Sequence, residues 1–282
     1  MTYIHWDFQE NAWINMPENV ILMMELLDIV FMSEKRKGVL LSLYTGSKEM
    51  QALLKSLRTT RQALLPQIRI LENSCLVSHN KDTYELTAIG RLIADRMIPL
   101  LGTIKVLDVD IDYWGRHNID FIPPYLMKRL QELGECSVVV PSLQEMHEFN
   151  RDVHNRSLES GSFFEVSSSF KSDFRMLFSD LAQRGVRMSF IISSELMDYL
   201  KKERYEDFKQ YLGTDGTEFY LYPKRMPFIT FVQNDFCLLL EMLTKEGTCD
   251  NTQLVCCDPG ALNWGRELFE HFRHNSTLIS GI

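Results

Sequence analysis

Apolar residues recur at helical spacing through the first third of the chain. One stripe between residues 47 and 57 falls at i, i+3, i+4 and i+7, namely Met50, Leu53, Leu54 and Leu57. A second helical stripe comprises Leu64, Ile68 and Leu71, after a turn at Arg58–Thr60. Two alternating segments, 76–79 and 83–87, then flank a polar tip at Asn80–Asp82. The order helix, turn, helix and two short strands predicts a winged helix-turn-helix.

The second helix has a polar side that suits DNA recognition. Arg61, Gln62 and Arg69 point away from its apolar stripe. Arginine and glutamine can hydrogen-bond base edges, although a solvated helix face explains the same residues without DNA. Pro66 costs a helix interior on the order of 3 kcal/mol. We therefore expect a bend there, or a regular helix that starts later than Thr60.

The two strands add a second point of contact. Lys81 lies at the exposed tip between them, where a wing reaches the DNA backbone. We predict that Arg61 and Gln62 read bases. The expected phosphate contacts are Arg58, Arg69 and Lys81.

Helical patterns also flank this segment. Residues 18–44 are expected to form one helix, or two helices broken near 31–33. Ser47 is expected to cap the next helix, and Thr87 is expected to cap a long helix over 88–107. The apolar stripe of the long helix is wider than a wing needs, which favours a dimer contact or a linker. Met16 precedes a good helix start and is an alternative translation start.

The second half of the chain alternates strand and helix. Short apolar strands are predicted at 136–140, 163–168, 186–192, 218–222, 228–233, 236–243 and 253–257. Asp258 and Pro259 open a closing helix. The fold class is therefore α+β: a winged helix-turn-helix followed by an α/β domain with a mixed sheet. We assign an arm to residues 1–19, the winged domain to 20–108 and the second domain to 125–282.

Charge is distributed unevenly along the chain. The net charge is −8, yet residues 33–96 carry +5, whereas residues 1–32 carry −5 and residues 97–282 carry −8. A basic segment on an acidic chain favours nucleic acid as its partner.

Composition excludes other classes. No apolar run approaches the roughly 18 residues of a membrane span, and the start has no signal core, so we expect a cytoplasmic protein. The six cysteines are scattered along the chain and do not form the pattern of a disulfide framework. We therefore expect them to be reduced thiols. A redox sensor is the lesser alternative, drawing on Cys237, Cys249, Cys256 or Cys257. No metal site or cofactor is expected, since end-of-helix solvation explains His271 and His274.

Four segments resemble a known family: FMSEKRKGVLLSL, LPQIRILENSCLV, DTYELTAIGRLIADRM and DPGALNWGRELFEHFR. They are similar to archaeal winged-helix regulators of the methanogen filament-regulator type, from about Leu22 to Phe272. The resemblance implies a cytoplasmic, dimeric transcription regulator whose C-terminal domain senses a signal.

The element order of the second domain also resembles one half of a phospholipase-D-like fold, as in archaeal sugar-responsive regulators. Phospholipase-D chemistry needs His-x-Lys followed by an Asp. The chain has this pair only at His79 and Lys81, and Leu86 stands where the Asp is required. We therefore predict no enzyme activity.

A small-molecule effector is expected at the carboxyl ends of the C-terminal strands. The candidate residues are Ser167, Ser169, Tyr222, Lys224 and Arg225. Helix capping and solvation are the plainer explanations of these residues. The alternative function is a protein-interaction module in which the winged domain binds a protein partner instead of double-stranded DNA.

Overall fold

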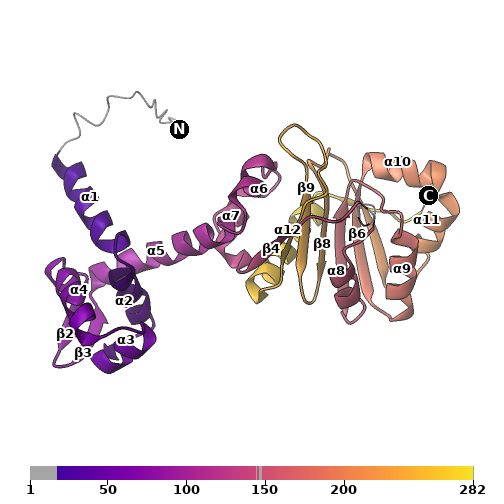
Figure 1. Cartoon of the computed structure of the whole chain (residues 1–282). Coiled ribbons are helices and arrows are strands. Elements are labelled where there is room, and N and C mark those ends of the chain that lie inside the picture. The colour runs from indigo at the N-terminus through magenta and orange to yellow at the C-terminus, as the bar shows by residue number, and fades with distance from the viewer. Residues whose placement is uncertain (1–17, 144, 146–147, 282) are drawn as a thin grey trace. The chain divides into compact units, whose positions relative to one another are not determined.

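The computed structural model describes residues 18–143, 145 and 148–281 (Figure 1). Most of the predicted arm and Met16 lie outside these residues. The chain divides into two compact units, residues 1–98 and 99–282, and the division falls inside one long helix.

The first unit has the predicted winged-helix order. Its elements are α1 (Glu18–Phe31), α2 (Glu34–Tyr44), β1 (Lys48–Glu49), α3 (Met50–Ser56), α4 (Arg61–Asn73), β2 (Val77–Asn80), β3 (Thr83–Leu86) and the start of α5 (Ala88–Leu107). The strands form an antiparallel sheet in the order β1-β3-β2. The apolar stripes of α3 and α4 supply its core, and Leu53, Leu64 and Ile68 are fully buried.

Local capping decides where these helices begin. Of the two alternatives for residues 18–44, the structure has two helices, and Ser33 accepts a hydrogen bond from the Arg36 backbone at the start of α2. The prediction that Ser47 caps α3 is wrong. Residues 48–49 instead extend to pair with β3, so Glu49 precedes the helix. Thr87 does cap α5, accepting from the Gly90 backbone at 3.0 Å.

The second unit is built on an eight-stranded mixed sheet, in the order β11-β7-β6-β5-β8-β9-β10-β4. Its strands are β4 (Cys136–Val139), β5 (Ser162–Ser167), β6 (Arg187–Ser193), β7 (Thr217–Tyr222), β8 (Phe228–Asn234), β9 (Leu238–Met242), β10 (Gln253–Cys256) and β11 (Thr277–Leu278). The strands β5, β6 and β7 are parallel and every other pairing is antiparallel. The α+β fold class is confirmed.

Helices cover both faces of this sheet (Figure 1). One face is packed by α6 (Ile111–Arg116), α7 (Pro124–Met127), the 3₁₀ helix η2 (Leu130–Leu133) and α12 (Pro259–Arg273). The other is packed by α8 (Arg151–Ser157), α9 (Phe174–Gln183), α10 (Ser194–Glu203) and α11 (Tyr205–Leu212). Each face thus has its own apolar core.

The segment expected to separate the domains belongs to the second unit. Tyr113, Trp114 and Phe121 are buried in the same core as α12. The indole of Trp114 donates to the Val106 carbonyl at 3.1 Å. Residues 109–124, between the two assigned domains, therefore pack against the sheet of the second unit through their aromatic side chains.

Candidate nucleic-acid interface

A tight turn sets the angle between α3 and α4. At the end of α3, the Thr59 N–H donates to the Leu54 carbonyl and the Arg58 N–H to the Lys55 carbonyl. This is a Schellman arrangement, which requires a left-handed residue at Arg58, where φ is 46°. Glycine is the usual residue there because an L side chain is strained at positive φ. Arginine therefore occupies this turn at a conformational cost.

The helix α4 begins at Arg61, directly after Thr60, and continues through Pro66 to Asn73. Arg61, Gln62 and Arg69 are exposed, whereas Leu64 is fully buried. Pro66 lies inside the helix on its exposed side. The bend at Pro66 stays a prediction. Thr60 is the N-cap residue but makes no side-chain capping bond.

Hydrogen bonds from α2 hold α4 in place. Arg36 donates to the Gln67 side chain on α4 at 2.9 Å and to the Ile29 carbonyl at 2.5 Å. Ser33 donates to the same Gln67 oxygen at 3.2 Å. Arg36 therefore holds α4 against α2 and also contacts α1 through the Ile29 carbonyl.

The wing ends in a second strained cation. Lys81 is exposed at the tip between β2 and β3, with φ at 57°. Beside it, Asp82 accepts from the Arg61 guanidinium at 3.2 Å, and both side chains are more than half exposed. This ion pair joins the start of α4 to the wing. Sequence spacing gives no sign of this ion pair, because Asp82 is 21 residues from Arg61.

The base of the wing is apolar. Tyr84 is buried on β3, and burial raises the pKa of its hydroxyl. Its ring packs 5.5 Å from His79, whose Nδ1 lies 2.5 Å from Glu72 on α4. The wing is therefore anchored to α4 at its base and at its tip.

The predicted effector residues do not come together. Ser167 donates to the Ser169 carbonyl at 2.8 Å at the end of β5. Tyr222 packs on the opposite face of the sheet, with its ring 5.2 Å from Phe272. Lys224 and Arg225 are exposed in the loop after β7. Of the five, Ser169 alone lines the cavity described next.

A cavity of about 470 Å³ opens beside the end of β5. Its lining includes Phe170, Tyr199 and Arg204, and the guanidinium of Arg204 lies 5.9 Å from the Phe170 ring centre. Lys171 also lines it and pairs with Glu241 at 2.9 Å, where both side chains are at least nine-tenths buried. Sequence reasoning missed these residues because they lie on separate loops and helices.

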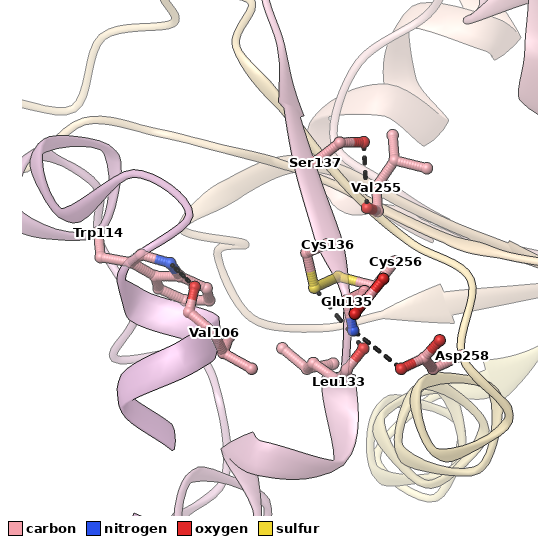
Figure 2. The surroundings of a disulfide bond; sticks show 9 residues. All are labelled: Val106, Trp114, Leu133, Glu135, Cys136, Ser137, Val255, Cys256 and Asp258. Atoms are coloured by element: carbon pink, nitrogen blue, oxygen red, sulfur yellow. Dashed lines mark hydrogen bonds between the residues drawn. A yellow bond between two sulfur atoms is a disulfide. The ribbon is translucent and has the colours of Figure 1, made fainter. Parts of the chain in front are cut away.

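The prediction of reduced, unbridged cysteines is wrong for one pair. Cys136 on β4 and Cys256 on β10 form a disulfide across 120 residues of sequence (Figure 2). The two residues are directly opposed in the antiparallel register, with Cα atoms 4.2 Å apart. Spacing along the chain gives no sign of this contact. The other four cysteines are free.

In the described part of the chain, no group of three His, Cys, Asp or Glu side chains is placed to hold a metal ion. None of the helices in the described ranges is long and apolar enough to cross a membrane.

Residues 24–105 match the N-terminal domain of Methanogenesis regulatory protein FilR1, and residues 146–275 match its middle domain. The chain belongs to this family of methanogen regulatory proteins. A FilR1 protein of Methanothrix harundinacea (strain 6Ac) is 25% identical over 262 residues, which cover 90% of this chain. The chain spans 58% of that relative's length, and its second domain corresponds to the family's middle domain.

Solved structures show more distant likeness. TrmBL2, described as an archaeal chromatin protein with a novel mode of DNA binding, is 12% identical at a TM-score of 0.41. The match covers 92% of this chain and 99% of that one. The phospholipase D family member Nuc from Salmonella typhimurium is 14% identical at a TM-score of 0.37, over 52% of this chain and all of that one. At these scores the likenesses carry no functional argument.

Proposed function

We propose that the chain is a transcriptional regulator that binds double-stranded DNA through its first unit. The exposed start of α4 would enter the major groove, with Arg61 and Gln62 facing base edges. Arg58, Arg69 and the wing residue Lys81 would contact phosphates. These exposed residues lie on α4, on the turn before it and at the wing tip.

The observation that carries the proposal is the use of cations at strained backbone positions. Arg58 and Lys81 both have positive φ, at the turn before α4 and at the wing tip. Stability alone favours glycine at such positions. Both positions, one on either side of α4, carry a charged side chain, which supports a role for the charge itself.

We also propose that the regulator is a homodimer acting in the cytoplasm. Ile89 and Leu92 on α5 are more than half exposed, and Leu100 and Ile104 further along the helix are 48% and 41% exposed. Exposed apolar side chains on one helix suit pairing with a second copy, and two copies suit DNA with two half-sites.

The second unit would bind an anionic effector in the cavity beside β5. Arg204 supplies positive charge, because the Lys171 ammonium is already paired with Glu241. Phe170 and Tyr199 supply aromatic surface with ring centres 5.9 Å apart. The cavity volume lies within the usual range for small-molecule sites. Thermal-shift screening of anionic metabolites tests this binding, and a melting-temperature increase seen with wild type should be lost in the matched variant Arg204→Ala.

DNA binding is tested by titrating the full chain with its own promoter in gel-shift experiments at several salt concentrations. We expect salt-dependent binding. Lys81→Ala should weaken binding at all sequences and reduce the salt slope by about 1, whereas Arg61→Ala should also relax specificity by about 1–3 kcal/mol. If no salt-sensitive DNA binding is seen at any protein concentration, the proposal is contradicted and a protein partner for the winged domain is favoured.

A further inference from the structure

The strand β10 ends at Cys256 and is followed directly by Cys257, and the two side chains face opposite sides of the sheet. Cys256 lies in the core under α12, where it is bridged to Cys136 of β4. Successive side chains of a strand alternate between faces, so Cys257 points to the other core. There it meets Cys237, which is fully buried in that core one residue before β9.

The register predicts that Cys257 and Cys237 are directly opposed. β10 and β9 are antiparallel, with Val255 opposite Leu239 and Cys256 opposite Leu238. One further step along the register brings Cys257 opposite Cys237. Cys256 is thus opposed to Cys136 of β4, and Cys257, one residue past β10, is opposed to Cys237, one residue before β9.

Both pairs are of the closely spaced kind. Directly opposed residues in antiparallel sheets alternate between hydrogen-bonded pairs and closer, non-hydrogen-bonded pairs with Cα atoms about 4.5 Å apart. Cys136 and Cys256 are 4.2 Å apart, which marks a non-hydrogen-bonded pair toward β4. The N–H and C=O groups of Cys256 therefore point toward β9. Those of the next residue, Cys257, point toward β4, so Cys257 makes a non-hydrogen-bonded pair on the side of β9.

The hydrogen bonds of Cys237 agree with this assignment. Its carbonyl accepts from the Asn234 N–H, and its own N–H donates to the Asn234 side chain at 2.8 Å. Both groups therefore face the β8 side of β9 and leave the side toward Cys257 unbonded. The two sulfurs are close enough that Cys257 contributes to raising the pKa of Cys237 to about 12, after burial as the larger cause.

We propose that Cys257 and Cys237 form a reversible thiol–disulfide site that reacts with low-molecular-weight disulfides. Cys257 is exposed and is the entry point, whereas Cys237 is shielded and resolves the reaction. Closure would link β9 to β10, as the Cys136–Cys256 bridge links β10 to β4.

The chemistry proceeds in two exchanges. The Cys257 thiolate attacks one sulfur of the small disulfide RSSR and releases RS⁻, which leaves a Cys257–S–SR mixed disulfide. Cys237 then gives up its proton to solvent and attacks the Cys257 sulfur, and the second RS⁻ leaves. The two protein thiols lose two electrons and two protons in total, and RSSR becomes two molecules of RSH.

The experiment uses the full chain with Cys75→Ser and Cys249→Ser, so that Cys237 and Cys257 are its two free thiols. After incubation with oxidised glutathione and an acid quench, we expect both thiols to be lost, no glutathione mass to be retained, and a peptide linking Cys237 to Cys257. Reduced glutathione in excess should restore both thiols.

Adding Cys237→Ser provides the matched control. This variant should stop at the mixed disulfide and keep one glutathione on Cys257. Peptide mapping of the oxidised wild-type chain gives the same answer if a variant fails to fold. Glutathione retained on Cys257 when Cys237 is present, a link between two chains, or thiols that stay unreacted would each overturn the proposal.

Discussion

Arg58 combines a structural cost with an expected functional gain. Its backbone is left-handed at φ 46° because α3 ends in a Schellman arrangement. For an L residue this conformation costs roughly 1 kcal/mol relative to glycine. The two effects of the residue can be separated by one substitution.

Arg58→Gly should raise the free energy of unfolding by about 1 kcal/mol, because glycine relieves the positive φ. The same change should weaken DNA binding and lower the salt slope by about 1, because one phosphate contact is lost. Urea unfolding and gel-shift titrations measure the two effects. Unchanged DNA affinity in a more stable variant would show that Arg58 serves only the turn.

Glu165 is a buried acid in the centre of the second unit. It lies on β5, is 3% exposed, and accepts from the Thr230 hydroxyl at 3.3 Å. Burial raises the pKa of its carboxyl from 4.5 to about 7, against the opposing effects of Thr230 and Lys171. The folded chain therefore holds this proton to a higher pH than the unfolded chain does.

This difference predicts that stability falls as pH rises from about 4.5 to about 7, because the native state binds more protons across that window. The loss from this group is on the order of 3 kcal/mol at pH above 7. Glu165→Gln should flatten that part of the profile in urea unfolding at several pH values. Glu218→Gln, an exposed acid on β7, is the control, and a Glu165→Gln profile parallel to wild type would refute the assignment.

At the scale of elements, the turn into β4 shows how local geometry supports the disulfide. Gly134 has φ 65°, and a Cβ there would lie 1.8 Å from Asp258. The same Asp258 carboxylate accepts from the Glu135 N–H at 2.9 Å, as Figure 2 shows. The start of β4 is thus held against the start of α12, beside the Cys136–Cys256 bridge.

Cys136→Ser should lower the free energy of unfolding of the second unit by roughly 2–5 kcal/mol, because the bridge closes a long loop in the unfolded chain. Calorimetry should show a lower melting temperature for this variant and no change for Cys249→Ser. A reductant should bring the wild-type chain to the same value and leave Cys136→Ser unaffected. Equal stability of the oxidised and reduced wild type would contradict the prediction.

The helix α4 shows how far element prediction reached. The positions of Leu64, Ile68 and Leu71 fixed its buried face, and the three are fully buried as expected. The same local reasoning misplaced the start of α3, because β1 forms only by pairing with β3, more than thirty residues away. Short-range periodicity cannot report such a pairing.

At the scale of the whole molecule, the proposed dimer makes α5 sensitive to an added charge. Leu92 is 58% exposed on α5. If the dimer forms there, Leu92→Glu should raise its dissociation constant at least about tenfold, because two charges would be buried in an apolar contact. Analytical ultracentrifugation tests this, with Leu278→Glu, at 54% exposure, as the matched control. A wild-type chain that is monomeric at micromolar concentration would rule the dimer out.

The sequence alone determined the features that depend on near neighbours. Helix and strand periodicity predicted the winged helix-turn-helix, the exposed residues Arg61, Gln62 and Arg69, and seven of the eight strands of the second unit. The two-residue strand β11 was missed, because it forms only by pairing with β7. Charge counted by segment made residues 33–96 the basic part of an acidic chain. These properties follow from side-chain pattern and composition, which folding does not alter.

Only the tertiary structure decided the contacts between distant positions. The Arg61–Asp82 ion pair, the Cys136–Cys256 bridge and the opposition of Cys237 to Cys257 each depend on how strands and helices pair. The cavity beside β5 draws on loops and a helix that periodicity treats separately. Register and packing bring these groups together, and a register is chosen by the whole sheet rather than by any one strand.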